Sequence, residues 1–283
     1  MNDEILQKLQ KCQLQMLDHF IDICDKYHLN WCSDAGTTLG AIRHGGMIPW
    51  DDDIDIMMPR KDYNRLLKLG PKVFKDPYFF QTPMTDTVFC VHAKLRLNNT
   101  TCMTKLDCLG THHRGVFIDI FPLDAIPDND EVYKNVIGFM RTIGHDTDFR
   151  FAGSKNHQNV SMTKARQLFT LMNDILTNIS EKNASSKYVT DLVMHRFRKI
   201  IGLKYERKDY DSFVDFSFKG LKHKIKVPIG YENVLTSQYG DWKVERRDDN
   251  IHGTMFVDLE NDYSKYDDLS IKDLEELING QRK

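Results

Sequence analysis

The segment best suited to chemistry is an acidic run, Pro-Trp-Asp-Asp-Asp-Ile-Asp-Ile, at residues 49–56. Asp51, Asp53 and Asp55 occupy alternate positions, and alternate side chains of a β-strand lie on the same face. Carboxylates that share a face repel one another, and partial burial makes their ionisation more costly still. A divalent cation relieves this repulsion, and ligands that are all oxygen favour Mg²⁺ or Mn²⁺ over Zn²⁺. The apolar residues that follow the run favour such a metal site at a strand end over a solvated acidic turn.

A second candidate acid lies in an apolar segment further along the chain. Residues 115–124 read Gly-Val-Phe-Ile-Asp-Ile-Phe-Pro-Leu-Asp, and Asp119 is the one acid inside the predicted strand. A lone carboxylate among buried apolar residues is costly unless it meets a cation. We therefore predict that Asp119 joins Asp53 and Asp55 around the metal. Asp124 follows a proline and is expected to cap a turn.

Small residues before the acidic run could receive a phosphate. Gly36-Thr37-Thr38-Leu39-Gly40 is expected to begin a short helix, with Thr37 and Thr38 as caps and free backbone N–H groups at its start. Either Gly36 or Gly40 could let a phosphate approach the backbone. An ordinary turn glycine is the alternative for each of them.

Basic side chains lie on both sides of the acidic run. Arg43 offers a planar fork to phosphate oxygens, whereas His44 could orient a phosphate, cap a turn or hydrogen-bond Asp51. Further along, His92, Lys94 and Arg96 share one face of a predicted strand. A basic face beside an acidic strand suits phosphate binding, and a solvated sheet face is an equally good interpretation.

The composition limits the function. The 283 residues allow one large or two small domains, and 39 Lys and Arg against 41 Asp and Glu argue against a nucleic-acid binder. The six cysteines form no C-x-x-C pair and are expected to be free thiols. The first residues lack the apolar core of a signal peptide, and no apolar stretch reaches the roughly 18 residues of a membrane span. We therefore expect a cytoplasmic enzyme.

The apolar spacing predicts both helices and strands. Helices are expected at residues 4–28, 60–69, 130–151, 161–180, 185–201, 231–239 and 270–280. The second of these is expected to end at Gly70-Pro71. Strands are expected at residues 31–34, 78–81, 88–97, 116–121 and 222–227, in addition to the acidic strand.

Residues 36–56, G-T-T-L-G-A-I-R-H-G-G-M-I-P-W-D-D-D-I-D-I, resemble the first motif of the LicD family. This family includes phosphocholine transferases and fukutin-related ribitol-phosphate transferases, and it belongs to the nucleotidyltransferase superfamily. Residues 115–124 resemble its second motif, and weaker similarities lie at residues 94–101 and 239–242. The good match covers roughly residues 30–125. No role is assigned to His112, His113, Asp241 or His252.

The resemblance implies an α+β fold, with a palm of the DNA polymerase β type and a helical insert. The palm would be a mixed β-sheet with flanking helices. We expect a nucleotidyltransferase-like core with an N-terminal helix at residues 1–127, a helical insert on the acceptor side at 128–220, and a C-terminal segment at 221–283 that returns to the core.

The resemblance also implies a phosphotransferase. Asp53, Asp55 and Asp119 would hold one or two Mg²⁺ (or Mn²⁺) ions, and phosphocholine would pass from CDP-choline to a sugar hydroxyl, with CMP leaving. Asp119 is expected to accept the hydroxyl proton. The acceptor would be a glycan or glycolipid of lipopolysaccharide, teichoic acid or capsule synthesis, which is compatible with peripheral membrane association. The substrate-binding residues would be Gly36, Thr37, Thr38, Gly40, Arg43, His44, Trp50, Asp51, Lys94, Arg96 and Tyr239.

A choline head group would require aromatic faces around its quaternary ammonium. Trp31, Trp50, Tyr239 and Trp242 are candidates, and each could be a core residue instead. Three other readings stay open. The donor could be CDP-ribitol or CDP-glycerol, the reaction could be nucleotidyl transfer with release of pyrophosphate, or the protein could be a non-catalytic nucleotide-binding module.

Overall fold

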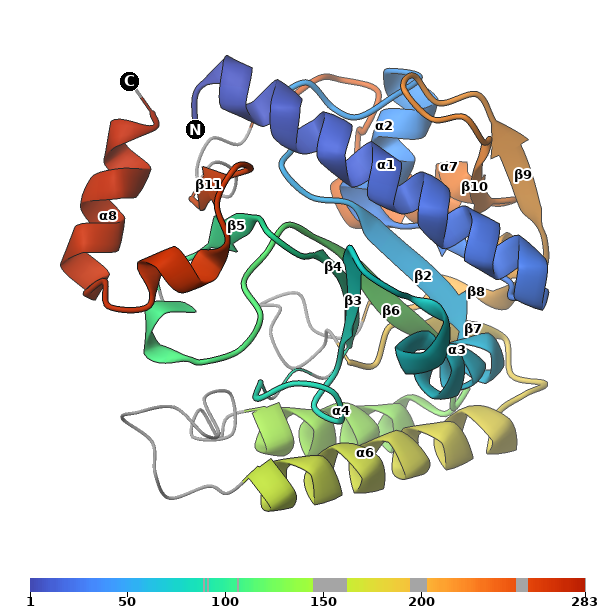
Figure 1. Cartoon of the computed structure of the whole chain (residues 1–283). Helices are drawn as coiled ribbons and strands as arrows, with labels where there is room; N and C mark the ends of the chain where they lie inside the picture. Colours follow the sequence, from blue (N-terminus) through green and yellow to red (C-terminus); the bar gives the residue numbers. More distant parts are fainter. Residues whose placement is uncertain are drawn as a thin grey trace.

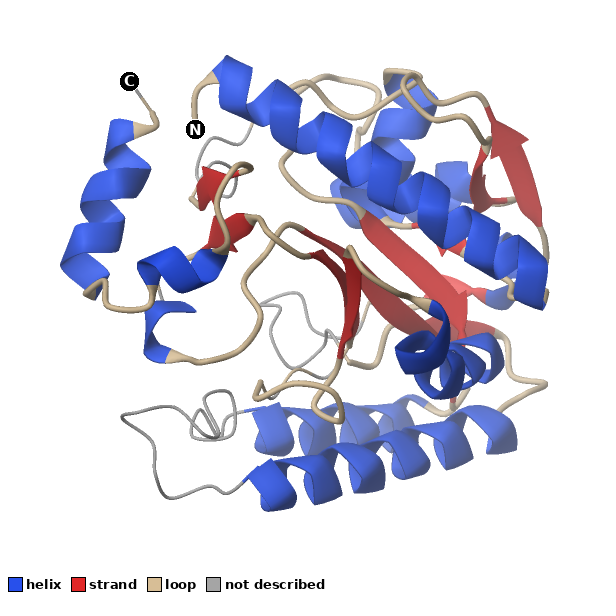
Figure 2. Ribbon diagram, in the orientation of Figure 1, coloured by secondary structure: helices blue, strands red, loops and turns tan. Residues whose placement is uncertain are grey.

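The computed structural model describes residues 1–88, 90, 92–105, 107–144, 162–193, 203–247 and 254–282. Helices and strands are mixed along this part of the chain, which confirms the α+β class (Figures 1 and 2). The helices are α1 (Asp3–Tyr27), α2 (Ala35–Arg43), α3 (Arg60–Val73), α4 (Asp130–Gly144), α6 (Met162–Lys182), α7 (Tyr231–Tyr239) and α8 (Ile271–Gly280). That the sheet is a palm of the polymerase β type stays a prediction, as does the division of the chain at residues 127 and 220.

The central sheet has seven strands. Its main path runs in the order β1 (Cys32–Ser33), β2 (Asp55–Pro59), β6 (Phe117–Ile126), β4 (Ala93–Leu97) and β3 (Tyr78–Gln81). β2 and β6 are parallel, whereas the other neighbours in this order are antiparallel. β7 (Tyr188–Thr190) pairs with the end of β6, and β8 (Tyr205–Glu206) pairs with β7. Two small sheets complete the fold, β9 (Phe213–Phe216) with β10 (Ile225–Pro228), and β5 (Thr101–Met103) with β11 (Phe256–Asp258).

The main core lies between the sheet and α1, which crosses one face of the sheet (Figure 1). Buried apolar residues such as Leu9, Met16 and Phe20 recur along α1 at helical spacing. They belong to the same apolar cluster as Ile56 of β2 and Ile118 of β6. One face of β2 and β6 is thereby buried, and the acids of these strands point to the other face.

A second core lies under α4 and α6, which run side by side in Figure 1. Tyr133 and Ile137 of α4 pack with Phe169 and Met172 of α6 and with Ile126 at the end of β6. The helices expected at residues 130–151 and 161–180 are confirmed in their described parts, whereas residues 145–151 and 161 lie outside these parts.

The helix expected at residues 185–201 is wrong in its described part. Tyr188–Thr190 forms β7 instead, because a β-branched run can extend the sheet beside β6. Residues 194–201 lie outside the described part.

The end expected for α3 is also wrong. The helix continues through Gly70 and Pro71 to Val73. A Cβ at residue 70 would lie 2.5 Å from Phe80 Cδ1. Gly70 therefore serves the close packing of α3 on β3 rather than the end of the helix.

No helix within these described ranges is long and apolar enough to cross a membrane.

Candidate active site

Acids from two strands meet in one row of the central sheet. Asp55, the first residue of β2, pairs directly with Asp119 of β6, because the two parallel strands are in register at these positions. Lys94 of β4 pairs with Asp119 from the other side. Residues that pair across neighbouring strands point to the same face of a sheet, so these three side chains share one face.

Two basic groups contact Asp119 on this face. Lys94 Nζ lies 2.5 Å and His92 Nε2 lies 2.9 Å from Asp119 Oδ1. The Lys94 ammonium also lies 3.8 Å from the centroid of the Phe117 ring. The side chains of Lys94 and His92 are only 17% and 13% exposed, so this basic face of β4 is not a solvated sheet face.

The acids before β2 lie in a turn, so the strand expected to begin at Asp51 is wrong there. The N–H of Asp51 donates to the carbonyl of Ile48, and the N–H of Asp52 donates to Asp51 Oδ1. In this turn Asp51, Asp52 and Asp53 each place one carboxylate oxygen within 4.8 Å of the others. Within the described ranges, they are the one such group of three or more His, Cys, Asp or Glu residues. Asp55 and Asp119 are not part of it.

The acids of the site differ in their electrostatic surroundings. Burial raises the pKa of Asp53 and Asp55 well above the ordinary value, and the neighbouring carboxylates add to this rise. Burial opposes the ionisation of Asp119 as well, but Lys94 and His92 outweigh it and hold the pKa of this carboxyl well below its usual range. Asp53 and Asp55 are therefore the acids whose ionised forms lack a cation.

Helix α1 holds the acidic turn from behind. Gln13 is fully buried, and its amide donates to the carbonyls of Asp52 at 2.9 Å and Phe117 at 3.3 Å. The amide of Gln10, one turn earlier, donates to the carbonyl of Asp51 at 2.8 Å. α1 therefore supports the site in addition to burying the core.

Two glycines of α2 have different roles. A Cβ at Gly36 would lie 2.5 Å from Asp51 Oδ2, so this glycine lets the start of α2 approach the acidic turn. A Cβ at Gly40 would lie 2.5 Å from the carbonyl oxygen of Gly46, so Gly40 serves the packing of α2 on the following loop. Gly36 is thus the glycine of the motif that lies beside the acids.

The capping role expected for Thr37 and Thr38 is wrong. The residue at the N-cap of α2 is Asp34, and its side chain makes no capping hydrogen bond. The Thr37 hydroxyl instead accepts a hydrogen bond from the N–H of Asp55 at 2.9 Å. The Thr38 hydroxyl lies 2.8 Å from the Ser33 hydroxyl. Thr37 therefore connects α2 to the first residue of the acidic strand.

Arg43 and His44 lie at the end of α2. Arg43 Nε lies 3.0 Å from His44 Nε2, and Arg43 Nη1 donates to the carbonyl of Trp242. His44 is the C-cap residue, with its N–H bonded to the carbonyl of Gly40, which agrees with the turn-capping alternative. The His44 ring meets the Trp50 ring edge to face at 6.0 Å. This group joins α2 to the segment after α7.

Arg96 differs from Lys94 in its contacts. It is buried, and its guanidinium donates to Gln81 Oε1 and to the carbonyl of Gly115, each at 2.7 Å. These bonds connect β4 to β3 and to the residues before β6. Contact of Arg96 with a substrate stays a prediction.

Asp124 does not cap a turn, contrary to the sequence prediction. β6 continues through Pro122, so Asp124 lies within the strand and is fully buried. Its two carboxylate oxygens accept hydrogen bonds from Nε and Nη2 of Arg60, each at 2.6 Å. The acid is therefore part of a buried ion pair between β6 and α3.

The four aromatic candidates for a choline site differ in how far their side chains are buried. Trp31 is fully buried in the main core, and Trp242 is buried beside α2. Both are core residues. Trp50 is half-buried in that second cluster, and Tyr239 is 40% exposed. Trp50 and Tyr239 are thus the two that keep accessible ring surface.

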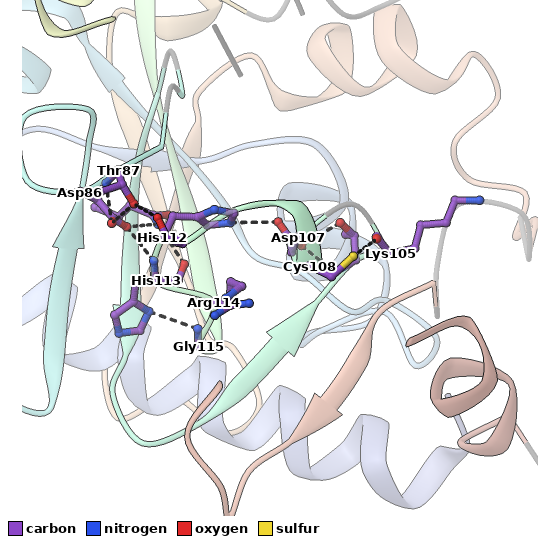
Figure 3. Close-up of polar contacts among 12 residues, drawn as sticks. Asp86, Thr87, Lys105, Asp107, Cys108, His112, His113, Arg114 and Gly115 are labelled. Atoms are coloured by element: carbon purple, nitrogen blue, oxygen red, sulfur yellow. Dashed lines mark hydrogen bonds and ion pairs between the residues drawn. The ribbon is translucent and has the colours of Figure 1, made fainter. Parts of the chain in front are cut away.

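The adjacent histidines make separate contacts, as Figure 3 shows. His112 Nε2 lies 3.0 Å from Asp107 Oδ1, whereas His113 Nδ1 accepts a hydrogen bond from the N–H of Gly115 at 3.1 Å. Both rings orient the loop before β6. His252 lies outside the described residues.

Several residues of the site were not predicted from the sequence. Asp52 is one of them, because a strand through residues 51–55 would place it on the face opposite to Asp51 and Asp53. His92 was recognised only as part of a basic face. Gln10 and Gln13 are polar residues near the apolar face of α1, and this interruption is the signal that could have identified Gln13.

The side chains present fit a divalent cation. Asp51, Asp52 and Asp53 supply carboxylate oxygens at close spacing, and Asp55 and Asp119 lie next to them in the sheet. All are oxygen donors. Such a donor set suits Mg²⁺ or Mn²⁺.

Comparison with known proteins gives the class of this protein. Residues 28–166 match the nucleotidyltransferase domain that the LicD, FKTN and FKRP proteins share. The chain is therefore a transferase enzyme. The matched segment is a domain of the LicD family, as the resemblance of the first motif predicted.

Lipopolysaccharide cholinephosphotransferase LicD of Haemophilus influenzae is 26% identical over 250 residues, which cover 84% of this chain and 91% of that protein. Uncharacterized proteins of Rickettsia prowazekii and Rickettsia typhi match over 58 residues, at 34% and 38% identity. Each of these two matches covers 20% of this chain.

Proposed function

We propose that this enzyme is a metal-dependent phosphotransferase that moves phosphocholine from CDP-choline to a sugar hydroxyl of a cell-surface glycan or its precursor. The observation that carries the proposal is the pairing of Asp55 with Asp119 beside the close group of Asp51, Asp52 and Asp53. The similarity to a cholinephosphotransferase over most of both chains supports the donor and the acceptor class. We infer further that the sheet is a palm of the polymerase β type.

The acids have different roles in the proposed reaction. Asp53, Asp55 and Asp119 would hold Mg²⁺ or Mn²⁺, which supplies charge neutralisation at the phosphate groups. Asp119 is ionised because Lys94 and His92 lower its pKa, so an acceptor hydroxyl can donate a hydrogen bond to it. A carboxylate with so low a pKa is a weak base, so we expect Asp119 to orient the hydroxyl more than to remove its proton fully.

Other residues of the site would bind the donor. The start of α2 at Gly36 and Thr37 faces the acidic turn, where backbone N–H groups of a helix favour phosphate. Lys94 lies in the same row as the acids and can neutralise a phosphate oxygen. Trp50 and Tyr239 are the aromatic residues with exposed surface for a quaternary ammonium.

Product analysis tests this proposal. With CDP-choline, Mg²⁺ and a lipopolysaccharide acceptor, the wild-type enzyme should release CMP and label the glycan. Asp55→Asn should lose more activity than the roughly 10- to 100-fold typical of residues that only orient metal ligands. Asp174→Asn, on the exposed face of α6, is the matched control and should keep full activity.

Two further results would contradict the proposal. Release of pyrophosphate in place of CMP would identify nucleotidyl transfer. If Asp55→Asn turned over at the wild-type rate, or if calorimetry showed no binding of Mn²⁺ to the wild-type enzyme, the proposed role of the metal would be contradicted.

A further inference from the structure

A cavity of about 670 Å³ lies on the same face of the sheet as the acids, but further along the strands. Pro59 of β2 and Leu123 of β6 line it, and these two residues pair with each other four positions beyond Asp55 and Asp119. Four residues of a strand span about 13 Å. Helices α3 and α6, the short 3₁₀ helix Arg207–Tyr210 and β7 complete the walls.

This cavity is separate from the acidic site. Met57 of β2 and its pairing partner Phe121 of β6 lie between the two along the strands, and both are buried. A ligand in the cavity would therefore be bound by a different set of residues from a nucleotide at the acids.

The cationic side chains of the cavity fall into two groups. Arg60 pairs with Asp124, and Arg65 pairs with Asp62, so acids of the protein neutralise both. Lys61 and Lys68, also on α3, have no such carboxylate partner within the described ranges.

Arg207, on the opposite wall, donates to the carbonyls of Asn183 and Ser186 and to the Ser186 hydroxyl. These neutral groups hold the guanidinium in place and leave its charge uncompensated. Together with Lys61 and Lys68, Arg207 gives the cavity cations on two sides that can bind an anion such as phosphate.

The remaining wall fits a hydroxyl-rich ligand. The carboxylates of Glu181 and Asp211 can accept hydrogen bonds from hydroxyl groups. Leu123, Ala125 and Val189 form an apolar surface between these polar groups. A sugar ring has this combination, with hydroxyls at its edge and apolar C–H groups on its faces.

We propose that this cavity binds a phosphorylated sugar. The phosphate contacts Lys61, Lys68 and Arg207, and the sugar hydroxyls contact Glu181 and Asp211. The ligand is either a phosphorylated residue of the acceptor glycan or a free sugar phosphate that acts as an effector. Both have the same chemistry at this site.

Calorimetric titration without donor or metal tests the site, so the result does not depend on the transferase activity. The probes are a panel of hexose 1- and 6-phosphates, the corresponding free hexoses and inorganic phosphate. We expect at least one hexose phosphate to bind saturably, and to bind more tightly than the free sugar or inorganic phosphate.

Two variants and a control assign the binding to this cavity. Lys61→Gln should weaken hexose phosphate binding roughly 5- to 10-fold, with no fall in melting temperature, because this exposed side chain has no ion-pair partner in the described part of the chain. Lys68→Gln should also weaken it. Lys72→Gln, on the same helix but outside the cavity, should bind as the wild type does.

Binding that is absent in the wild type, or that is equally tight in the wild type, Lys61→Gln and Lys68→Gln, would overturn the proposal. Binding of inorganic phosphate as tight as that of every hexose phosphate would overturn the sugar component. Once binding is found, the transfer assay distinguishes the sources. Competition with the acceptor identifies a residue of the acceptor glycan, and a change of rate without competition identifies a free effector.

Discussion

Neighbouring carboxyl groups in this site have pKa values shifted in opposite directions, because their surroundings differ. Asp53 and Asp55 are surrounded by other acids, so burial and repulsion favour their protonated forms. Asp119 contacts Lys94 and His92, which favour its ionised form. Environments that separate pKa values in this way are typical of sites in which acids have different roles. This difference supports the proposal that Asp119 orients the acceptor hydroxyl in addition to holding the metal with Asp53 and Asp55.

His113 shows the same principle in the loop before β6. Its Nδ1 accepts a hydrogen bond from the N–H of Gly115, and its Nε2 lies 2.9 Å from Asn98 Oδ1. Both ring nitrogens are thus engaged in the neutral form, and a proton on Nδ1 would break the bond to Gly115. Burial, with a smaller effect of Arg96, lowers the pKa of His113 to about 4.

The pKa of His113 gives a prediction about stability and pH. The folded-state pKa of about 4 lies below the unfolded value of 6.5, so the unfolded chain binds more protons between these values. Stability should therefore fall as the pH is lowered through this window, and His113 should account for about 2 kcal/mol between pH 7 and pH 5. Urea unfolding at both values should show a smaller loss for His113→Asn than for the wild type. Equal losses in the two proteins would contradict this cause.

At the residue scale, the sequence predicted the acids whose position depends on a repeating pattern. Asp119 is one acid in an apolar strand, and Asp55 follows the same logic, so their pairing could be anticipated. The close group of Asp51, Asp52 and Asp53 could not, because the turn at Ile48 places Asp52 with its neighbours rather than on the opposite face. The partner of Asp124 could not be predicted either, since Arg60 lies in another element.

At the scale of elements, α1 both buries the core and supports the acidic turn, and only the first of these roles could be predicted from its sequence. Its apolar spacing predicted the helix and its buried face. The hydrogen bonds from Gln13 to the acidic turn depend on where the helix lies across the sheet, which helical spacing alone does not determine. The strand β7 is a similar case, because the edge of β6 decides the conformation of Tyr188–Thr190.

The position of Gln13 gives a prediction for α1. Gln13→Ala removes the donor to the carbonyls of Asp52 and Phe117, which leaves buried acceptors unpaired and should cost about 1–3 kcal/mol of stability. It should also lower kcat roughly 10- to 100-fold in the folded protein, because the acidic turn loses its support. Gln15→Ala, on the exposed side of the same helix, is the matched control. If the kcat of Gln13→Ala equalled that of the control, α1 would contribute to the packing of the core and not to the geometry of the acidic turn.

At the scale of the whole molecule, two apolar cores meet at the end of β6. The main core lies under α1, and the second lies under α4 and α6, with Ile126 of β6 in the second. The ion pair of Arg60 and Asp124 lies near this junction, and Arg60 Nη1 donates to Asn173 of α6. A polar contact thus connects β6, α3 and α6 where the two cores adjoin.

The energetics of this ion pair give a prediction for the whole fold. Burial raises the pKa of Asp124 although Arg60 opposes the rise, whereas Asp124 raises the pKa of Arg60 against the effect of burial. Each buried charge therefore depends on the other. Arg60→Met should therefore leave an uncompensated buried carboxylate and cost about 3–5 kcal/mol. Asp124→Leu should cost a similar amount, because it leaves the guanidinium unpaired.

The double variant Arg60→Met with Asp124→Leu distinguishes a stabilising pair from a costly one. Because it removes both buried charges together, we expect its free energy of unfolding to lie well above that of either single variant, close to the wild-type value. Urea unfolding of the four proteins measures this coupling. Losses that add up in the double variant would mean that the two charges do not depend on each other, and that the junction between the cores relies on apolar packing alone.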